Sequence, residues 1–342
     1  MDEEMGIGPE RLDHLLRGFS RQRVLVVGDM VADEYLFGTP VRISREAPVV
    51  ILEFSRRELV PGGATNVAVN LRDLGAKVDV VGVIGADATG MELRQTLAYR
   101  GIGVEGLVTA PERPTSTKTR IVGGGVQVVQ QQIVRLDRIV SDPMSSDCRD
   151  RLLRAAETAC LAADGLILSD YEHGVLDPQV SGACLSTPRH ARMVTTVDAH
   201  GDLFRFHGMT LATPNQPEAE ATLGRTLGSP DKLEQACRDL LLGMDAQGVL
   251  ITRGSQGLVA LDRARHFTVL PALNMAEVRD ATGAGDTVAA AATLVLGAGG
   301  TLAEAAAIGN MAASLVVRRF GAATVTTEGL AAAFRAAASA GG

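Results

Sequence analysis

Short, almost wholly apolar segments that end in a polar residue recur along the chain, and segments with helical spacing lie between most of them. The clearest are 23–29 (RVLVVGD), 77–85 (KVDVVGVIG), 165–170 (GLILSD), 193–198 (MVTTVD), 209–215 (MTLATPN) and 248–254 (GVLITRG). Continuous runs of Val, Ile and Leu are typical of strands buried on both faces of a parallel sheet. Strands that alternate with helices form βαβ units. The sequence therefore predicts an α/β protein, with a mostly parallel central sheet covered by helices on both faces.

Polar residues stand where these predicted strands end. They are Asp29, Asp170, Asp198, Asn215 and Arg253. Ligands of open parallel sheets bind outside the carboxyl ends of the strands. We therefore expect the functional site at the edge of the sheet where these side chains gather.

Two segments, 41–59 and 115–138, do not follow the alternation, because they are rich in β-branched residues and have no helix between their apolar stretches. We interpret them as antiparallel strands that project from the main sheet and form a small β lid. Such a lid would cover the site or pair with a second subunit. Neither an internal repeat nor a linker divides the chain, so we expect residues 1–342 to form a single domain with these lid segments inserted.

Composition excludes several classes of function. The net charge is −7, so the chain offers no basic face of the kind that nucleic-acid binding needs. No apolar run approaches the roughly 18 residues of a membrane span, and the acidic N-terminus lacks the features of a signal peptide. The four cysteines contain no CxxC spacing, which fits reduced thiols. We expect a soluble, cytoplasmic protein that binds neither nucleic acid nor membrane.

The strongest local signal is the segment 279–300, in which Thr282-Gly283-Ala284-Gly285-Asp286 opens a helix of small residues. Glycines let backbone N–H groups converge, and a helix N-terminus adds partial positive charge, so this segment can form an anion hole. Such a hole suits the charge that develops on a transferred phosphoryl group. Asp286 at its mouth can accept the proton of an attacking hydroxyl. The alternative interpretation is a glycine-rich turn with Asp286 as an ordinary first-turn charge.

Two weaker signals accompany it. The segment 61–70 (PGGATNVAVN) combines two glycines with Asn66 near a helix start, which suits hydrogen bonding to sugar hydroxyls. In 213–220 (TPNQPEAE), Asn215 and Glu218 can serve a hydrated Mg²⁺ near phosphates, although a helix start explains them equally well. A P-loop is excluded because no lysine follows a glycine, and 101–106 (GIGVEG) follows a helix, which is the reverse of the dinucleotide-binding context.

Taken together, these motifs resemble the ribokinase-type (PfkB) carbohydrate kinases. The matching pieces are VVGDMVADEY, PGGATNVAVN, LSDYEHGVL, TPNQPEAE, ITRGSQGL and DATGAGDT, in the order and approximate spacing of that family. The resemblance covers most of the chain. It implies a ribokinase-like α/β sandwich with a β lid that is often shared in a dimer. It also implies transfer of the γ-phosphate of ATP to a sugar hydroxyl, with Mg²⁺ as cofactor.

Within that family the chain is most similar to the D-glycero-D-manno-heptose-7-phosphate kinases, which make heptose 1,7-bisphosphate. The pieces that carry this similarity are VLVVGDMVADEYLFG, VRISREAPVV, TSTKTRIV, QQIVRLD and LSDYEHGVL. The bifunctional relatives carry a further nucleotidyltransferase domain with an HxGH motif. That motif is absent from this sequence, so the chain resembles the kinase-only form.

The resemblance also assigns roles, residue by residue, to the matched positions. Catalysis falls to the base Asp286, with Gly283, Ala284 and Gly285 as anion hole, and sugar binding to Asp33, Gly62, Gly63 and Asn66, with Asp170 facing the reaction centre. Nucleotide binding falls to Thr252, Arg253, Gly254, Gly257 and, near the adenine, Asn310. Asn215 and Glu218 would organise Mg²⁺ and phosphates, Glu218 through water, and Asp280 and Thr282 match positions that bind a monovalent cation such as K⁺.

A phosphorylated sugar requires cationic partners, and lysines are scarce in this chain. Lys118 and Arg120 flank Thr119, a spacing that places both side chains on one face of a strand, and Arg42 is a further candidate. We expect Lys118 and Arg120 to bind the substrate phosphate; the alternative interpretation is a charged outer face of the lid. The alternatives are a kinase for another sugar (a fructose phosphate, ribose or a keto acid), and a non-catalytic sugar- or nucleotide-binding regulator. The apolar lid strands also predict a homodimer formed through the lid.

Overall fold

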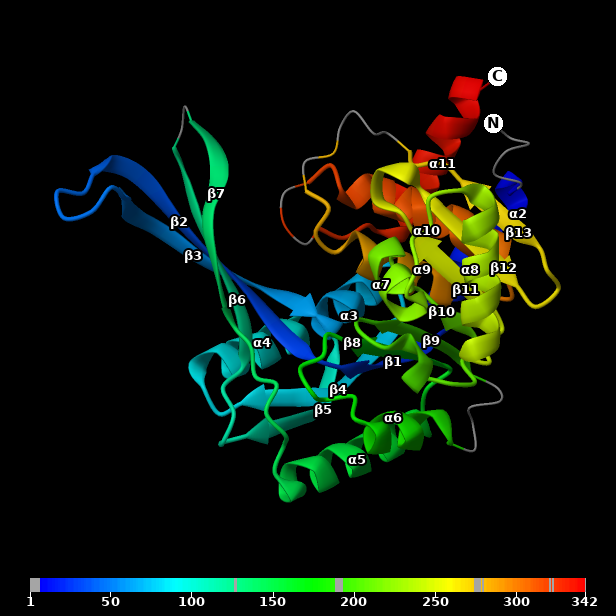
Figure 1. The fold of residues 1–342 in the computed structure, drawn as a ribbon, viewed down its shortest axis with the longest axis horizontal. Helices are drawn as coiled ribbons and strands as arrows, with labels where there is room; N and C mark the ends of the chain where they lie inside the picture. The colour runs from blue at the N-terminus through cyan, green and yellow to red at the C-terminus, as the bar shows by residue number, and fades with distance from the viewer. Residues whose placement is uncertain are drawn as a thin grey trace.

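The computed structural model describes residues 7–125, 128–187, 193–273, 278, 280–319, 321 and 323–341, and within them a nine-stranded sheet forms the body of the molecule (Figure 1). Its strand order is β13-β12-β11-β10-β9-β8-β1-β4-β5. The strands are β1 (Arg23–Gly28), β4 (Lys77–Gly85), β5 (Gly103–Ala110), β8 (Gly165–Asp170), β9 (Val194–Ala199), β10 (Leu211–Ala212), β11 (Gly248–Thr252), β12 (Leu258–Asp262) and β13 (Phe267–Leu270). Neighbours from β5 to β11 run parallel, whereas β12 and β13 add an antiparallel edge.

Both faces of this sheet are buried under helices. Along β1, Val24 and Val26 pack into the core on one face, and Leu25 and Val27 into the core on the other. The first face is covered by α2 (Pro9–Phe19), α3 (Ala64–Asp73), α4 (Ala88–Tyr99), α9 (Ala284–Gly297), α10 (Leu302–Val316) and α11 (Thr327–Gly341). The second is covered by α5 (Ser146–Cys160), α6 (Pro178–Leu185), α7 (Gln216–Leu223) and α8 (Pro230–Gly243). This two-sided burial explains why the strand sequences are continuously apolar rather than alternating.

The α/β architecture predicted from the alternation is thereby confirmed, and most predicted strands fall within one or two residues of their bounds. The segment 209–215 is the exception, because only Leu211–Ala212 forms a strand there. The antiparallel pair β12–β13 was not predicted. These two strands form the edge of the sheet, and their apolar stretches are too short to stand out from loops.

A second sheet of four strands, ordered β3-β2-β6-β7, projects from the body as the lid (Figure 1). Its strands are β2 (Met30–Ile43), β3 (Val50–Gly63), β6 (Ser116–Gly125) and β7 (Val128–Arg138). The lid therefore begins before the predicted segment 41–59 and continues past it, because β2 follows β1 with only Asp29 between them. Residues 126 and 127 of the second lid segment lie outside the described residues.

The expectation that the lid is wholly antiparallel is wrong, because its central pair, β2 and β6, is parallel. The outer pairs, β2–β3 and β6–β7, are antiparallel as expected. The topology gives the reason: β2 follows β1 and β6 follows β5, and β1 and β5 run in the same direction in the main sheet. Both strands therefore enter the lid with the same polarity.

Two smaller observations bear on the predicted class. All four cysteines are buried as free thiols. Among the described residues, none of the helices combines the length and the apolar character needed to cross a bilayer.

Candidate active site

Asp286 lies in the first turn of α9, at the carboxyl-end edge of the main sheet, and only 6% of it is exposed. Gly283 caps the helix with φ of 77°, a left-handed conformation that side-chain-bearing residues rarely adopt. A Cβ at this glycine would also lie 2.5 Å from the side-chain nitrogen of Asn66. The glycine therefore allows α9 to begin close against α3, which brings Asn66 to Asp286.

Two neutral donors hold the Asp286 carboxylate, one on each oxygen. The Asn66 amide donates to Oδ2 at 2.5 Å, and the Tyr171 hydroxyl donates to Oδ1 at 2.8 Å. Burial raises the pKa of Asp286 to about 6, because desolvation disfavours its charged form, although both hydrogen bonds oppose this. A carboxylate with such a pKa is ionised at neutral pH and is still basic enough to accept a proton.

A polar chain behind Asn66 fixes α3 against α9. Asn70 donates to the backbone carbonyl of Asn66 at 2.9 Å and accepts from the Thr287 hydroxyl at 2.8 Å. Asn66 and Asn70 are both almost fully buried, so these bonds replace those that water would make. Asn66 is thus the partner of Asp286, a role that the sugar-binding prediction did not include.

The amides of the predicted anion hole differ in their hydrogen-bond partners. The Ala284 N–H donates back to the carbonyl of Ala281 at 3.2 Å, so it is already engaged. Among the described residues, the N–H groups of Gly285 and Asp286 have no acceptor. A Cβ at Gly285 would meet nothing within 4 Å, so the space in front of this turn is open. The anion hole stays a prediction, and at this turn it would use these later amides rather than that of Ala284.

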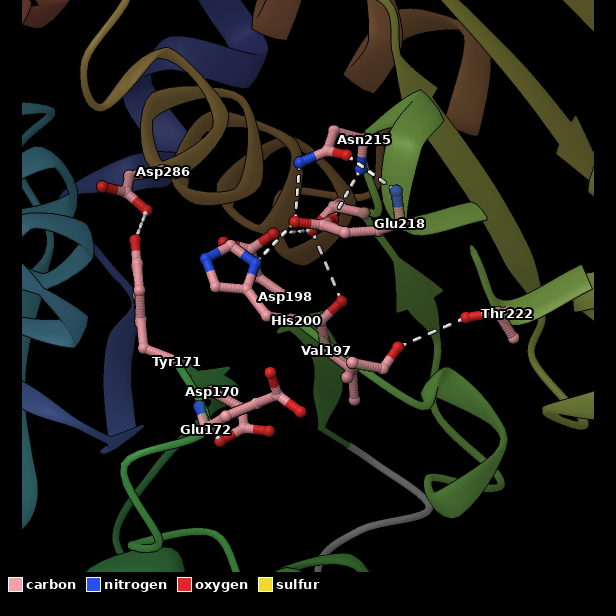
Figure 2. A network of polar contacts seen from close by, with 12 residues as sticks. Asp170, Tyr171, Glu172, Val197, Asp198, His200, Asn215, Glu218, Thr222 and Asp286 are labelled. Atoms are coloured by element: carbon pink, nitrogen blue, oxygen red, sulfur yellow. Dashed lines mark hydrogen bonds and ion pairs between the residues drawn. The ribbon is translucent and has the colours of Figure 1, made fainter. Parts of the chain in front are cut away.

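A cavity of about 170 Å³ opens beside Asp286, and polar side chains line it (Figure 2). Its lining residues are Tyr171, Asp198, His200, Thr213, Asn215, Glu218, Thr252, Gly283, Gly285 and Asp286. We call it the acceptor-side cavity. Asp198 comes from the end of β9, and the Thr213 hydroxyl donates to its Oδ1 at 3.0 Å. Burial, with the nearby charges of Asp286 and Glu218, raises the pKa of Asp198.

Glu218 and Asn215 form a capping box at the start of α7. The Glu218 carboxylate also accepts from Nδ1 of His200 at 2.5 Å and from the Asn215 amide at 2.6 Å. The helix-start interpretation of TPNQPEAE is therefore confirmed, and the polar atoms of the pair also line the cavity. Their role toward Mg²⁺ and phosphates stays a prediction. Figure 2 shows this group on the opposite side of the cavity from Asp286.

A larger cavity of about 450 Å³ lies on the other side of the Gly283–Gly285 turn. We call it the nucleotide-side cavity. Of the residues predicted to bind the nucleotide, Thr252, Gly254, Gly257 and Asn310 line it, and it shares Asn215, Thr252 and Gly285 with the acceptor-side cavity. Arg253 is absent from its described lining, because its guanidinium is hydrogen-bonded to Gln216 and Gln256.

The base of the lid supplies Asp33 and its partners. Asp33 is 5% exposed and forms an ion pair with Arg120 at 2.6 Å. A Cβ at Gly62 would lie 2.6 Å from an Asp33 oxygen, which explains the glycine there. Lys118 is half-buried, with its Nζ 5.1 Å from the centre of the Tyr171 ring. Gly63, with φ of 54°, ends β3 where α3 begins.

Two residues do not lie where the sequence predicted. Asp170 does not face the reaction centre: it forms an ion pair with Arg205 and accepts from the Glu172 N–H at 3.1 Å. The next residue, Tyr171, extends from the carboxyl end of β8 toward Asp286 instead. Arg42 pairs in register near Ile51 at the far end of β2, nine residues from Asp33, which corresponds to about 30 Å along a strand. Arg42 is therefore remote from the site of its own chain.

Asp280 and Thr282 stand in the loop before α9. Both Asp280 carboxylate oxygens accept backbone N–H groups, from Thr282 at 2.9 Å and from Gly321 at 3.0 Å, which contributes to a lowered pKa of Asp280. These bonds help to shape the loop before α9. Each carboxylate oxygen can accept a further contact, so they do not exclude a monovalent cation at Asp280.

The sequence matches the family profile of the pfkB family carbohydrate kinases over residues 21–177 and 188–328. The chain belongs to the pfkB family of carbohydrate kinases. The family membership predicted from its motifs is thus confirmed.

Curated relatives and solved structures agree with this membership. The "Bifunctional protein HldE" of Citrifermentans bemidjiense is 39% identical over 307 residues, which are 90% of this chain and 62% of the relative. That of Nitrosococcus oceani is 40% identical over 329 residues, 93% of this chain and 65% of the relative. The chain thus spans less than two-thirds of these relatives.

Two solved structures share the fold at 20% identity. Phosphofructokinase-2 from Escherichia coli in complex with potassium superposes with a TM-score of 0.73, covering 93% of this chain and 99% of that one. Arabidopsis thaliana ribokinase complexed with ribose and ATP gives 0.68, covering 92% and 99%. The ribokinase-like fold is confirmed.

The sequence did not single out Tyr171 or His200 as residues of the site, and it gave no sign that Asp29 would hold the backbone of Tyr171. Asp29 was noted as a strand end, and Tyr171 lies within the quoted LSDYEHGVL. His200 follows the strand-end Asp198 by two residues. The available signal was position, because each stands within two residues of a strand's carboxyl end.

Proposed function

We propose that this pfkB-family kinase phosphorylates the anomeric hydroxyl of a heptose 7-phosphate, giving heptose 1,7-bisphosphate. The observation that carries the proposal is the position of Asp286, buried at the start of α9 in the wall of the acceptor-side cavity and next to Gly285, which lines both cavities. The choice of heptose is supported by the lid and strand motifs, VRISREAPVV and LSDYEHGVL above all, and by the HldE relatives at about 40% identity.

The proposed chemistry is a single in-line transfer. The anomeric oxygen forms a bond to the γ-phosphorus while its proton passes to Oδ1 or Oδ2 of Asp286. The bond from that phosphorus to the bridging oxygen breaks, and its electron pair leaves with ADP. The protonated Asp286 then returns the proton to solvent. The N–H groups of Gly285 and Asp286, which have no acceptor among the described residues, would stabilise the charge on the transferred group.

Mg²⁺ would be held beside this point largely through water. Asp198 and Glu218 present carboxylate oxygens, the donors that Mg²⁺ prefers, to the acceptor-side cavity. Among the described residues, no three acidic, histidine or cysteine side chains are arranged to hold a metal ion directly. Glu218 is already hydrogen-bonded to His200 and Asn215, which favours contact through water rather than direct ligation. The bound ion would neutralise phosphate charge during the transfer. A monovalent cation such as K⁺ near Asp280 and Thr282 would order the loop that leads into the anion hole.

ATP would occupy the nucleotide-side cavity, with its adenine toward Asn310 and its phosphates toward Thr252 and Gly285. The size of that cavity, about 450 Å³, supports this assignment. The shared wall of the two cavities would then place the γ-phosphate against the anion hole.

The substrate phosphate has two candidate partners, which differ in whether their charge is already paired within the protein. Arg120 is paired with Asp33, so its first role is to hold that carboxylate for the sugar hydroxyls. Lys118 faces the Tyr171 ring on the same side of the lid and makes no ion pair among the described residues. We assign the phosphate to Lys118 first and to Arg120 as a supporting charge.

A substrate panel tests the proposal. Purified enzyme with MgATP is assayed for ADP release on stereoisomeric heptose 7-phosphates, fructose 6-phosphate, fructose 1-phosphate and ribose, and the product is identified by ³¹P NMR. The expected result is the highest kcat/KM for a heptose 7-phosphate, with the new phosphate on C1. A higher kcat/KM for fructose phosphate or ribose would move the assignment to that sugar. No ADP release on any substrate would favour a non-catalytic binding protein.

We also propose that two chains pair through their lids. One face of the lid has an apolar hollow of about 670 Å³, and several of its apolar side chains are largely exposed, among them Val50, Phe54, Ile133 and Val134 at 46–66%. An exposed apolar surface on β-strands favours association with a second chain. Light scattering at micromolar concentration should give a dimer for the wild type and a monomer for Phe54→Asp. A monomeric wild type contradicts the proposal.

A further inference from the structure

Tyr171 follows directly after β8 and contacts the proposed base. Its hydroxyl donates to Oδ1 of Asp286 at 2.8 Å (Figure 2). The Asn66 amide donates to Oδ2. The two donors come from different elements, Asn66 from α3 and Tyr171 from the residue after β8. A carboxylate with one donor on each oxygen is restrained from rotating about its Cβ–Cγ bond.

The backbone of Tyr171 is held by Asp29. The Asp29 carboxylate accepts N–H groups from Tyr171 at 2.7 Å, His173 at 3.1 Å and Val175 at 3.2 Å. Glu172, between them, has φ of 61°, a left-handed conformation that is uncommon for a residue with a side chain. Such backbone strain persists only where the surroundings over-determine it, and it concentrates at functional sites.

The Tyr171 ring is held as well. The His200 ring packs against it in a T-shaped arrangement at a centroid distance of 4.7 Å, and Nζ of Lys118 lies 5.1 Å from its centre. Burial and the neighbouring Asp286 charge raise the pKa of Tyr171 well above its ordinary value. The phenol therefore stays protonated and acts only as a donor toward Asp286.

We propose that Tyr171 is a positioning residue, whose hydroxyl fixes the orientation of the Asp286 carboxylate and supports its ionised form. The inference rests on the proposed function, in which Asp286 is the base. A purely structural tyrosine would be satisfied by backbone or solvent. Here the hydroxyl is directed at the one carboxylate in the anion hole, and a strained turn holds the backbone that delivers it.

Tyr171→Phe removes only the hydroxyl. We expect kcat to fall about 10-fold, which is the size expected for a lost hydrogen bond to a charged group, with KM for both substrates within about twofold. The acid limb of the kcat–pH profile should move up by about one pH unit, since the lost bond favoured the ionised carboxylate. Tyr99→Phe is the matched control, because Tyr99 is 95% exposed and should change nothing.

Several other charges act on Asp286, namely Asp33, which raises its pKa, and His200, which lowers it, with Asp198 and Lys118 close by. None of them is altered in Tyr171→Phe. Parallel profiles of Asp33→Asn and His200→Gln measure how far each of these charges moves the limb. A limb in Tyr171→Phe that stays within 0.2 pH units of the wild type, or a kcat within about twofold of it, overturns the proposal.

A merely structural role makes a different pattern. It would lower Tm and raise both KM values while leaving the acid limb in place, and that outcome also overturns the proposal. A second readout does not depend on the substrate: ¹³C carboxyl NMR of aspartate-labelled, ligand-free enzyme, with the Asp286 signal identified by its loss in Asp286→Asn. Tyr171→Phe should raise that titration midpoint. Failure of wild-type turnover on heptose 7-phosphates would contradict the proposed function and leave this measurement intact.

Discussion

The two cavities that meet at Gly285 differ in chemistry. The acceptor-side cavity has five ionisable side chains in its wall, those of Tyr171, Asp198, His200, Glu218 and Asp286. The nucleotide-side cavity is more than twice as large, and its described lining is wholly uncharged, with glycines, alanines and valines predominating. Ionisable side chains that are hydrogen-bonded to one another form much of the wall of the acceptor-side cavity. Small, uncharged residues form most of the wall of the nucleotide-side cavity.

The difference indicates where substitutions should matter. On the acceptor side, each polar group satisfies another in a buried setting, so removal of one leaves its partner without a bond. On the nucleotide side, apolar contact is spread over many small residues, and no single side chain carries a large share. We therefore expect single substitutions to affect kcat strongly on the acceptor side and KM for ATP weakly on the nucleotide side.

The largest effect is expected for Asp286→Asn, which keeps the shape and removes proton acceptance. General bases typically contribute about 10² to 10⁴ in rate, so we expect kcat to fall at least 100-fold. Because burial raises the pKa of Asp286, ionisation costs the folded state stability above about pH 6. The variant should therefore unfold at a higher temperature than the wild type at pH 8, and this difference should shrink below pH 6.

Steady-state kinetics and ATP binding by calorimetry check this prediction, with thermal unfolding at both pH values. Asp147→Asn, at an exposed side chain in the first turn of α5, is the control. An Asp286→Asn enzyme that keeps most of its kcat would remove Asp286 from the role of base. The contrast between the cavities would then lose its main support.

The next largest effect is expected to distinguish the two positively charged lid side chains, Lys118 and Arg120. Lys118→Ala should raise KM for heptose 7-phosphate about 10-fold, from the loss of one charged hydrogen bond, and leave KM for the dephosphorylated heptose unchanged. Arg120→Ala should raise KM for both the phosphorylated and the dephosphorylated heptose, because it leaves the buried Asp33 carboxylate without its ion pair. KM for ATP should change little in either variant.

Kinetics on the two heptoses measure this difference, with Lys77→Ala, at the exposed start of β4, as the control. If Lys118→Ala weakens both heptoses equally, the residue shapes the lid and does not bind the phosphate. If Arg120→Ala affects only the phosphorylated sugar, the ion pair with Asp33 is not what positions the sugar.

The sequence predicted the architecture well because two-sided burial leaves a direct mark, the continuous apolar strand. The glycines of the turn before α9 were equally visible, since close approach and a positive φ at Gly283 permit few other residues. The lid was harder to delimit, because β2 continues from β1 with one residue between them and shows no boundary in composition.

Which strand-end side chain enters the site could not be predicted, because adjacent residues point to opposite sides. Asp170 turns away to Arg205, and the next residue, Tyr171, turns toward Asp286. The choice depends on the turn at Glu172, which is set by the distant Asp29. Likewise, the motif alone could not predict that the Ala284 N–H donates to the Ala281 carbonyl, because the sequence does not distinguish the amides of this turn.

The smallest effect is expected on the nucleotide side, at Asn310. Its amide donates to the carbonyl of Pro271 at 2.8 Å, and the side chain lines the larger cavity. Asn310→Ala removes one neutral hydrogen bond, so KM for ATP should rise about threefold while kcat and the sugar KM stay unchanged.

Ser314→Ala is the matched control for Asn310→Ala, because Ser314 lines the same cavity, while its hydroxyl already donates to the Met311 carbonyl of its own helix at 2.7 Å. Initial-rate kinetics with ATP varied at saturating sugar measure both variants. A kcat loss of 10-fold or more in Asn310→Ala would contradict the separation of the cavities. It would mean that α10 transmits the fit of the nucleotide to the anion hole on α9, the helix packed against it.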